Sequence, residues 1–129
     1  MKLSEQEVNA ILKLDEFKRY QYFIKRIADN ELIYTMKNSE DQYAISEIED
    51  QIFVPFWSAK EFAKICLTDE WQNFIIVEIS LDDLEEELIS FLNENDFLMN
   101  IFPIQPKTGF VVDVSEFTRD LNDELENYS

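Results

Sequence analysis

Residues 74–92 are FIIVEISLDDLEEELISFL, and this stretch predicts both kinds of secondary structure in the protein, a strand followed by a helix. The continuous apolar run at residues 74–77 predicts a strand that is covered on both faces. Ser80 is a suitable N-cap for the helix that follows. After Ser80, apolar residues recur at helical spacing, at Leu81, Leu84, Leu88, Phe91 and Leu92.

Toward the C-terminus, residues 98–104 and 110–114 are predicted to form two strands. Between them lies the turn Gln105-Pro106-Lys107-Thr108-Gly109. Gly109 is the only glycine in the chain, and we expect it to take a turn position with positive φ. A last helix is predicted for residues 115–125, because Phe117, Leu121 and Leu125 share one face.

Toward the N-terminus, Ser4 and Glu7 form a capping box, and Asp15 is a second N-cap before a stronger helix that ends near residue 28. Whether these two helices are continuous stays open. Residues 32–36, 43–45 and 52–54 are rich in strand-forming side chains and are predicted to form a three-stranded antiparallel meander. Pro55 should end its last strand or mark an edge.

Ser58 and Glu61 match a further capping box before a short helix, whose apolar face holds Phe62, Ile65 and Cys66. Helices interspersed with hairpins predict an α+β fold. We expect a mixed or antiparallel sheet of about five to six strands packed by three to four helices. The chain has no internal repeat and no linker-like segment, so residues 1–129 are expected to form one domain.

The formal net charge is −17, and it is unevenly distributed. Residues 1–68 carry 9 basic and 12 acidic side chains, whereas residues 69–129 carry 2 basic and 16 acidic ones. Such a field repels nucleic acid and anionic lipid and attracts basic protein surfaces. The same charge is also typical of a protein that is simply kept soluble by it.

Several kinds of active site are excluded by composition. The chain has no histidine, one cysteine and one glycine. A His-dependent triad, a structural zinc site and a glycine-rich phosphate loop are therefore not expected, and no cofactor is implied. Cys66 lies on an apolar helix face and is expected to be buried and inert. Catalysis by a pair of carboxylates stays open.

The sequence also indicates the cellular compartment of the protein. The N-terminal residues do not place an apolar segment after a basic start, so we expect no signal peptide. No apolar run reaches the roughly 20 residues needed to span a bilayer. A single cysteine cannot form an internal disulfide. A cytoplasmic protein is the simplest interpretation.

Two groups of residues are candidates for binding. Arg19, Tyr20 and Arg26 lie on the predicted second helix, in a local basic patch that also holds Lys13, Lys18 and Lys25. Such a patch suits an anionic ligand or a partner's carboxylates. The same cations could instead have a structural purpose. They could pair with carboxylates four residues away on the helix, stabilise the C-terminal end of the helix, or contact the acidic half of the same chain.

Phe56 and Trp57 follow Pro55 at a strand-to-helix junction. Trp57 at such a corner suits an exposed interface anchor, or a staple that packs the helix entry. A third candidate is the acidic face formed by Asp82, Asp83 and Glu86 at the start of the helix after Ser80. Carboxylates there complement the helix dipole and are expected to face water.

Several of these segments, in this order, resemble the bacterial domain of unknown function 2750 family. They are Arg19-Tyr20-x-x-Phe23-x-x-Arg26, Val54-Pro55-Phe56-Trp57, Phe62-Ala63, Trp71, Phe102-Pro103 and Gly109-Phe110-Val111-Val112. Ser58 stands where a second proline often follows the tryptophan. The resemblance covers nearly the whole chain and implies a stand-alone bacterial α+β domain. It implies no activity.

Two hypotheses for function follow from the sequence. In the first, the protein is not an enzyme and binds a basic partner surface through its acidic half, as a small inhibitor or immunity-like protein would. In the second, a pocket between the Arg19/Arg26 helix and the Pro55–Trp57 corner binds a small ligand or catalyses an unusual carboxylate-based reaction. The oligomeric state stays open.

Overall fold

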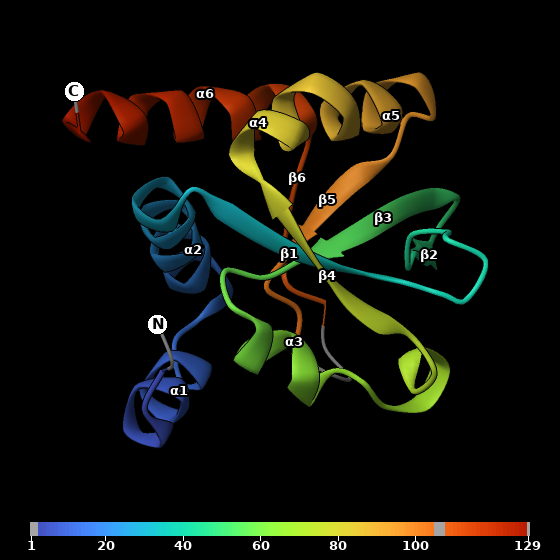
Figure 1. Cartoon of the computed structure of the whole chain (residues 1–129), viewed down its shortest axis with the longest axis horizontal. Helices are drawn as coiled ribbons and strands as arrows, with labels where there is room; N and C mark the ends of the chain where they lie inside the picture. The colour runs from blue at the N-terminus through green and yellow to red at the C-terminus, as the bar shows by residue number, and fades with distance from the viewer. Residues whose placement is uncertain (1–2, 105–107, 129) are drawn as a thin grey trace.

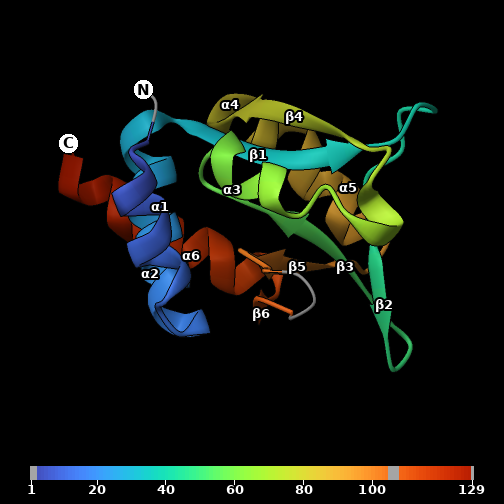
Figure 2. The same cartoon turned by 90° about the horizontal axis from the view of Figure 1, so that it is seen from below.

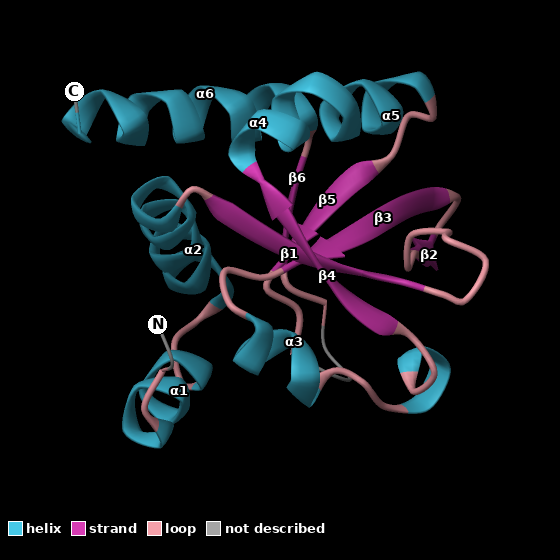
Figure 3. Ribbon diagram, in the orientation of Figure 1, coloured by secondary structure: helices cyan, strands magenta, loops and turns pink. Residues whose placement is uncertain are grey.

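The computed structural model describes residues 3–104 and 108–128. Within them the α-helices are α1 (Glu5–Leu12), α2 (Glu16–Asn30), α3 (Lys60–Ile65), α4 (Leu81–Asp83), α5 (Ile89–Glu94) and α6 (Val114–Leu125). The strands are β1 (Leu32–Lys37), β2 (Ser46–Ile48), β3 (Gln51–Phe56), β4 (Ile75–Ser80), β5 (Leu98–Ile101) and β6 (Phe110–Val112). Figures 1 and 3 show their arrangement, which confirms the predicted α+β class.

The strands belong to two sheets. β1 and β4 form an antiparallel pair, with Leu32 opposite Ser80. The larger sheet has the order β2-β3-β5-β6, in which β3 and β5 are parallel and the outer pairs are antiparallel. Tyr34 and Trp57 join the two sheets by exchanging two backbone hydrogen bonds of 2.9 Å. In Figure 2 the β1–β4 pair lies above β3 and β5, so the sheets form two layers.

The predicted three-stranded meander is wrong in its pairing. β1 pairs with β4 along its whole length, and residues 43–44 contact it through an isolated bridge between Tyr43 and Lys37 and a hydrogen bond from the Ala44 N–H to the carbonyl oxygen of Met36. The short strand β2 begins at Ser46 and pairs with β3. Local sequence cannot reveal this choice, because strand pairing depends on which segments meet in the folded chain. Pro55 does not end β3; it lies beyond the residues that pair with β2 and within the parallel ladder to β5.

β4 also differs from its prediction. Only Ile79 of this strand is buried, and Ile75 is 62% exposed. The strand has a single neighbour, β1, in a two-stranded sheet. One of its faces therefore meets water, although its sequence is typical of a strand covered on both faces.

The leucine stripe predicted after Ser80 is confirmed. The Ser80 hydroxyl accepts a hydrogen bond from the backbone N–H of Asp83, and the leucines at 81, 84, 88 and 92 are buried. A π-helical turn, Leu84–Leu88, joins α4 to α5, so the three segments form one continuous helix. Because leucines four residues apart drift around a regular α-helix, the wider π turn helps to keep them on the inner side.

The other predicted N-caps differ in outcome. Ser4 accepts from the backbone N–H of Glu7, and Asp15 accepts from that of Lys18, so α1 and α2 are separate helices. The last helix begins one residue earlier than predicted, because Asp113 caps it through the backbone N–H of Glu116. The capping box at Ser58 is absent, and α3 has no side-chain cap at its N-terminus.

Gly109 serves a different purpose from the predicted one. Its φ is not positive. A β-carbon at this position would lie 2.1 Å from the carbonyl oxygen of Ile101, so glycine is required by the close approach of two backbone segments. The Gly109 N–H donates to the Asn100 side chain at 2.8 Å. Residues 105–107 of the predicted turn lie outside the described residues.

The core lies between the two sheets and the helices. Its largest fully buried side chains include Trp57, Phe23, Phe56, Phe62, Phe102 and Phe117. In Figure 1, α4, α5 and α6 lie along the top of the molecule, α2 on the left, and α1 and α3 below. Among the described residues, no helix combines the length and apolar character needed to cross a membrane.

Candidate functional site

Arg19 and Tyr20 stabilise the packing of α2. The Arg19 side chain is buried and donates to the carbonyl oxygen of Leu14, in the loop between α1 and α2. The buried Tyr20 donates to Asp120 of α6 at 2.7 Å, and its ring stacks on Phe110 with centroids 4.7 Å apart. Burial and this hydrogen bond raise the pKa of Tyr20. Arg19 lines none of the hollows described below, whereas Tyr20 borders a hollow of about 310 Å³ between α2 and α6.

Phe56 and Trp57 belong to the core. Both are fully buried. The Trp57 indole N–H donates to the carbonyl oxygen of Pro103 at 3.1 Å, and its ring meets Trp71 edge to face with centroids 6.1 Å apart. The corner after Pro55 is therefore a packed junction, and it does not present an exposed anchor. Cys66 is buried beside it, with its thiol 3.3 Å from the same carbonyl oxygen.

Arg26 lies in a different environment from Arg19. It borders a cavity of about 680 Å³, called the α2–α3 cavity below, which lies between α2, α3 and the β1–β4 sheet. Its lining residues come from five segments of the chain: Leu3, Tyr22, Arg26, Asn30, Leu32, Tyr34, Ser58, Ala59, Lys60, Glu61, Lys64 and Glu78. Neither Arg19 nor Trp57 is among them. The pocket predicted between these residues is thus replaced by one that shares only Arg26 with it.

Three cations surround the α2–α3 cavity. Arg26 is partly exposed, and Lys60 and Lys64 are exposed. Among the described residues, none of them forms an ion pair or a side-chain hydrogen bond. Their charges are therefore not neutralised by a close ion pair.

The carboxylates of the cavity already accept hydrogen bonds. Glu61 accepts from the backbone N–H of Leu3 at 3.0 Å, and Glu78 accepts from the Tyr34 hydroxyl at 2.9 Å. Burial tends to raise the pKa of Glu61, but the backbone N–H groups and the charges of Lys60 and Lys64 hold it below its usual value. Glu61 therefore stays ionised at neutral pH and fastens Leu3 to the cavity wall.

The two tyrosines of the cavity donate to carboxylates. Tyr22 donates to Glu7 of α1 at 3.0 Å, and Tyr34 donates to Glu78. Burial, followed by these hydrogen bonds, raises the pKa of both Tyr22 and Tyr34 to about 12. Both phenols are thus neutral, and their protons are already used.

Ser58 is the polar group that sequence reasoning assigned wrongly. It is buried, borders the α2–α3 cavity, and its hydroxyl has no hydrogen-bond partner within residues 3–104 and 108–128. Glu61, its expected partner in the capping box, bonds to Leu3 instead. No local signal could have shown this, because residues 3 and 61 are 58 positions apart.

The acidic candidates lie on the side of the molecule opposite to the α2–α3 cavity. Asp82, Asp83 and Glu86 are exposed, as predicted for helix-start carboxylates. The helix at residues 81–94 lies beside α6 along the top of Figure 1. We call the exposed carboxylates of these helices the acidic layer, which consists of Asp82, Asp83, Glu85, Glu86, Glu87, Glu94 and Asp123. Among the described residues of these helices, Arg119 is the one cation, and it pairs with Asp120 at 3.7 Å.

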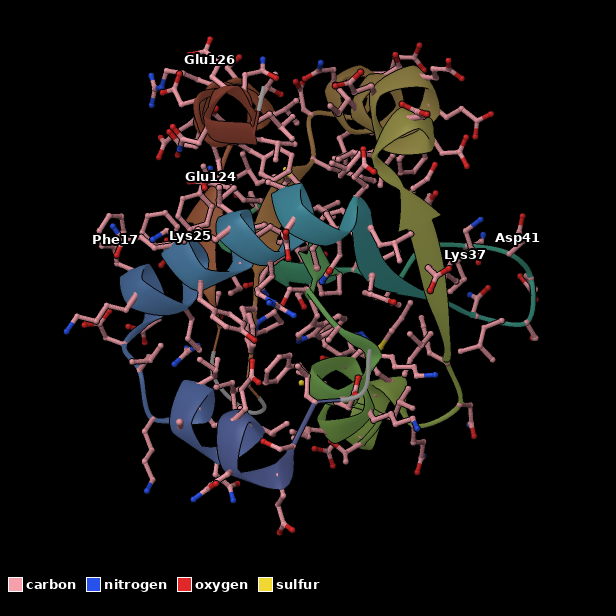
Figure 4. All side chains as sticks on the ribbon, turned by 60° about the vertical axis from the view of Figure 1, so that its left-hand side comes forward. Phe17, Lys25, Lys37, Asp41, Glu124 and Glu126 are labelled. Atoms are coloured by element: carbon pink, nitrogen blue, oxygen red, sulfur yellow. The ribbon has the colours of Figure 1, made fainter. Side chains whose placement is uncertain are left out.

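The predicted basic patch does not stay together. Lys25 is adjacent to Arg26 in sequence but borders a separate hollow of about 310 Å³ between α2 and α6, together with Phe17 and Glu124. Figure 4 shows these three labelled side chains on one side of the molecule. The Lys37–Asp41 ion pair, at 3.1 Å, lies on the other side of the same view. Among the described residues, no group of His, Cys, Asp and Glu side chains is arranged to hold a metal ion.

Comparison with known families gives one match. A family model described as "Protein of unknown function (DUF2750)" matches residues 20–121 of the chain. A search of curated proteins finds no match. The matched region contains every lining residue of the α2–α3 cavity except Leu3, and it leaves α1 outside.

Proposed function

Because the chain belongs to the DUF2750 family, whose description assigns no activity, we propose from its charge and geometry that it is a non-catalytic protein that binds a basic partner surface. The acidic layer is the contact surface in this proposal. The function is one of recognition, in the manner of a small inhibitor, and the partner is a cytoplasmic protein with clustered lysine and arginine side chains.

The proposal rests on carboxylates whose charge is not neutralised by lysine or arginine side chains of the same chain. The helix at residues 81–94 contains acidic side chains and no lysine or arginine. The described residues contain two ion pairs, Lys37–Asp41 and Arg119–Asp120, and neither reaches that helix. Carboxylates that repel one another at one surface destabilise the folded state slightly. A partner that supplies the missing cations would relieve that repulsion.

The experiment is capture of partners by the immobilised protein at two salt concentrations, followed by affinity measurement with the purified partner. We expect binding at low ionic strength and at least tenfold weaker binding at about 0.5 M NaCl, where charges are screened over a few ångströms. The variant Asp82→Asn/Asp83→Asn/Glu86→Gln should bind at least about tenfold more weakly.

The matched control carries the same change of charge elsewhere. Glu40, Glu47 and Glu70 are exposed and lie outside the acidic layer, so Glu40→Gln/Glu47→Gln/Glu70→Gln should retain most of the affinity. Far-UV circular dichroism checks that both triple variants are folded. A partner whose affinity is indifferent to salt, or equal losses in the two variants, would contradict recognition by the acidic layer.

A further inference from the structure

The α2–α3 cavity has the properties of a second binding site, independent of the acidic layer. We infer that it binds a small organic molecule through a phosphate or carboxylate group, with Arg26 as the central anchor and Lys60, Lys64 and Ser58 as further donors. Four features of the cavity support this: its surplus of donors, its buried hydroxyl, its mixed walls and its size.

The surplus of donors is the first feature. Glu61 and Glu78 already accept hydrogen bonds from Leu3 and Tyr34, whereas Arg26, Lys60 and Lys64 form no close ion pair and no side-chain hydrogen bond among the described residues. The guanidinium group of arginine presents paired N–H donors that match the two oxygens of a carboxylate or phosphate. Three cations and two carboxylates give the lining a formal excess of one positive charge, which an anionic group would neutralise.

The hydroxyl of Ser58 is the second feature. Its side chain is more than nine-tenths buried, and its oxygen has no partner. A buried hydroxyl without a hydrogen bond is unfavourable and calls for a specific reason. Ser58 follows the buried Trp57, whose backbone is fixed by two hydrogen bonds to Tyr34, so its position at the cavity is set by the core. Its proton has no acceptor among the described residues.

The walls and the size of the cavity indicate the rest of the ligand. Leu3, Leu32 and Ala59 contribute apolar surface, and the rings of Tyr22 and Tyr34 contribute aromatic surface. A volume of about 680 Å³ lies in the range of roughly 300–1,000 Å³ that is typical of small-molecule sites. A phosphate or carboxylate alone would leave most of it empty. The ligand is therefore an anionic head with an uncharged organic body.

Phenyl phosphate is a suitable probe, because it combines a phosphate group with an aromatic body. Isothermal titration calorimetry at low ionic strength should give a Kd of about 1 mM or tighter, and inorganic phosphate and phenol should each bind more weakly. Benzoate in place of phenyl phosphate tests whether a carboxylate is preferred to a phosphate. Either preference supports the inference, whereas failure of both aromatic anions to bind would overturn it.

Substitutions locate the binding. Arg26→Met should weaken binding of the preferred probe at least about tenfold. Lys25→Met is the matched control, since Lys25 is the neighbouring cation on α2 but borders the other hollow, and it should leave the affinity within about twofold. Equal losses in the two variants would show that net charge, and not the cavity, governs binding, and would overturn the assignment.

Ser58→Ala provides an independent measurement. It removes a hydroxyl that has no partner in the described part of the chain, so the free variant should be at least as resistant to urea as the parent. The same variant should bind the probe several-fold more weakly. Unchanged affinity would exclude Ser58 from the site, and a marked loss of stability would show that the hydroxyl serves the fold.

Discussion

At the scale of single residues, every backbone conformation with positive φ among the described residues is adopted by a residue other than glycine. Among the described residues, seven non-glycine residues have positive φ, and most of them are acidic: Glu31, Asp41, Glu49, Asp50, Asp69, Asp96 and Phe102. Aspartate tolerates the left-handed region better than most residues because its short side chain can bond to the local backbone. Phe102 is the exception, since a bulky residue with positive φ is strained.

The strained Phe102 explains the single glycine. Its ring is fully buried and packs against Phe62 with centroids 4.5 Å apart, and its N–H donates to the carbonyl oxygen of Phe56 at 2.8 Å. These contacts hold the backbone of residues 101–103 directly against Gly109, where a β-carbon would lie 2.8 Å from Phe102 and from Pro103. The one glycine is therefore placed where two backbone segments touch.

This close approach leads to a prediction for Gly109→Ala. The added methyl group would meet rigid backbone atoms, so we expect a loss of about 3 kcal/mol in the free energy of unfolding, measured by urea denaturation. Thr108→Ala, at the partly exposed neighbouring position, is the control and should change stability by less than about 0.5 kcal/mol. A Gly109→Ala protein as stable as the parent would show that the two segments can separate.

At the scale of elements, residues at the helix ends determine where a helix begins and ends and where the chain goes next. α2 begins at the Asp15 cap and ends at Glu31, whose backbone is left-handed with φ 59°. The N–H of Glu31 donates to Ile27, and its carbonyl accepts from the N–H of Leu81 at 3.1 Å. The end of α2 is thus tied to the start of the helix at residues 81–94, and the sharp turn at Glu31 directs the chain into β1.

Glu31→Gly should stabilise the protein. Glycine adopts the left-handed conformation without steric cost, and glutamate does not. Glycine also has more conformational entropy in the unfolded state, which offsets part of this benefit. We therefore expect the free energy of unfolding to rise by about 0.5–1 kcal/mol, measured by thermal and urea unfolding. Glu31→Ala removes the same charge but keeps the strain, so it should give little or no gain. Equal gains in the two variants would attribute the effect to charge.

At the scale of the whole molecule, charge is separated between two surfaces. The acidic layer lies along the top of Figure 1, and the cations of the α2–α3 cavity lie on the side of α3. Few ion pairs connect acidic and basic side chains within the described residues. Repulsion among carboxylates therefore opposes folding, and the apolar core between the two sheets must offset it.

Salt should consequently stabilise this protein. We expect the melting temperature at neutral pH to rise by about 2–5 °C between low ionic strength and about 0.3 M NaCl, because screening weakens the repulsion. The rise should be smaller for Asp82→Asn/Asp83→Asn/Glu86→Gln, which removes part of the repulsion in advance. Differential scanning calorimetry provides the measurement. A melting temperature that stays constant or falls with NaCl would show that internal ion pairing outweighs repulsion.

The sequence by itself determined the features that depend on near neighbours. The caps at Ser4, Asp15 and Ser80 and the leucine stripe of residues 81–92 were predictable, because capping and amphipathicity act over three or four residues. The α+β class was also predictable from the sequence. The exposed position of Asp82, Asp83 and Glu86 followed from the same periodicity.

Only the tertiary structure decided which distant segments meet. It paired β1 with β4, placed Gly109 against the backbone at Ile101, buried Trp57 and Arg19, and left the hydroxyl of Ser58 without a partner. It also brought Lys60 and Lys64 to the same cavity as Arg26. These outcomes depend on packing between side chains that are tens of residues apart. Local spacing carries no signal for such contacts, because they are selected by the shape and burial of the whole core.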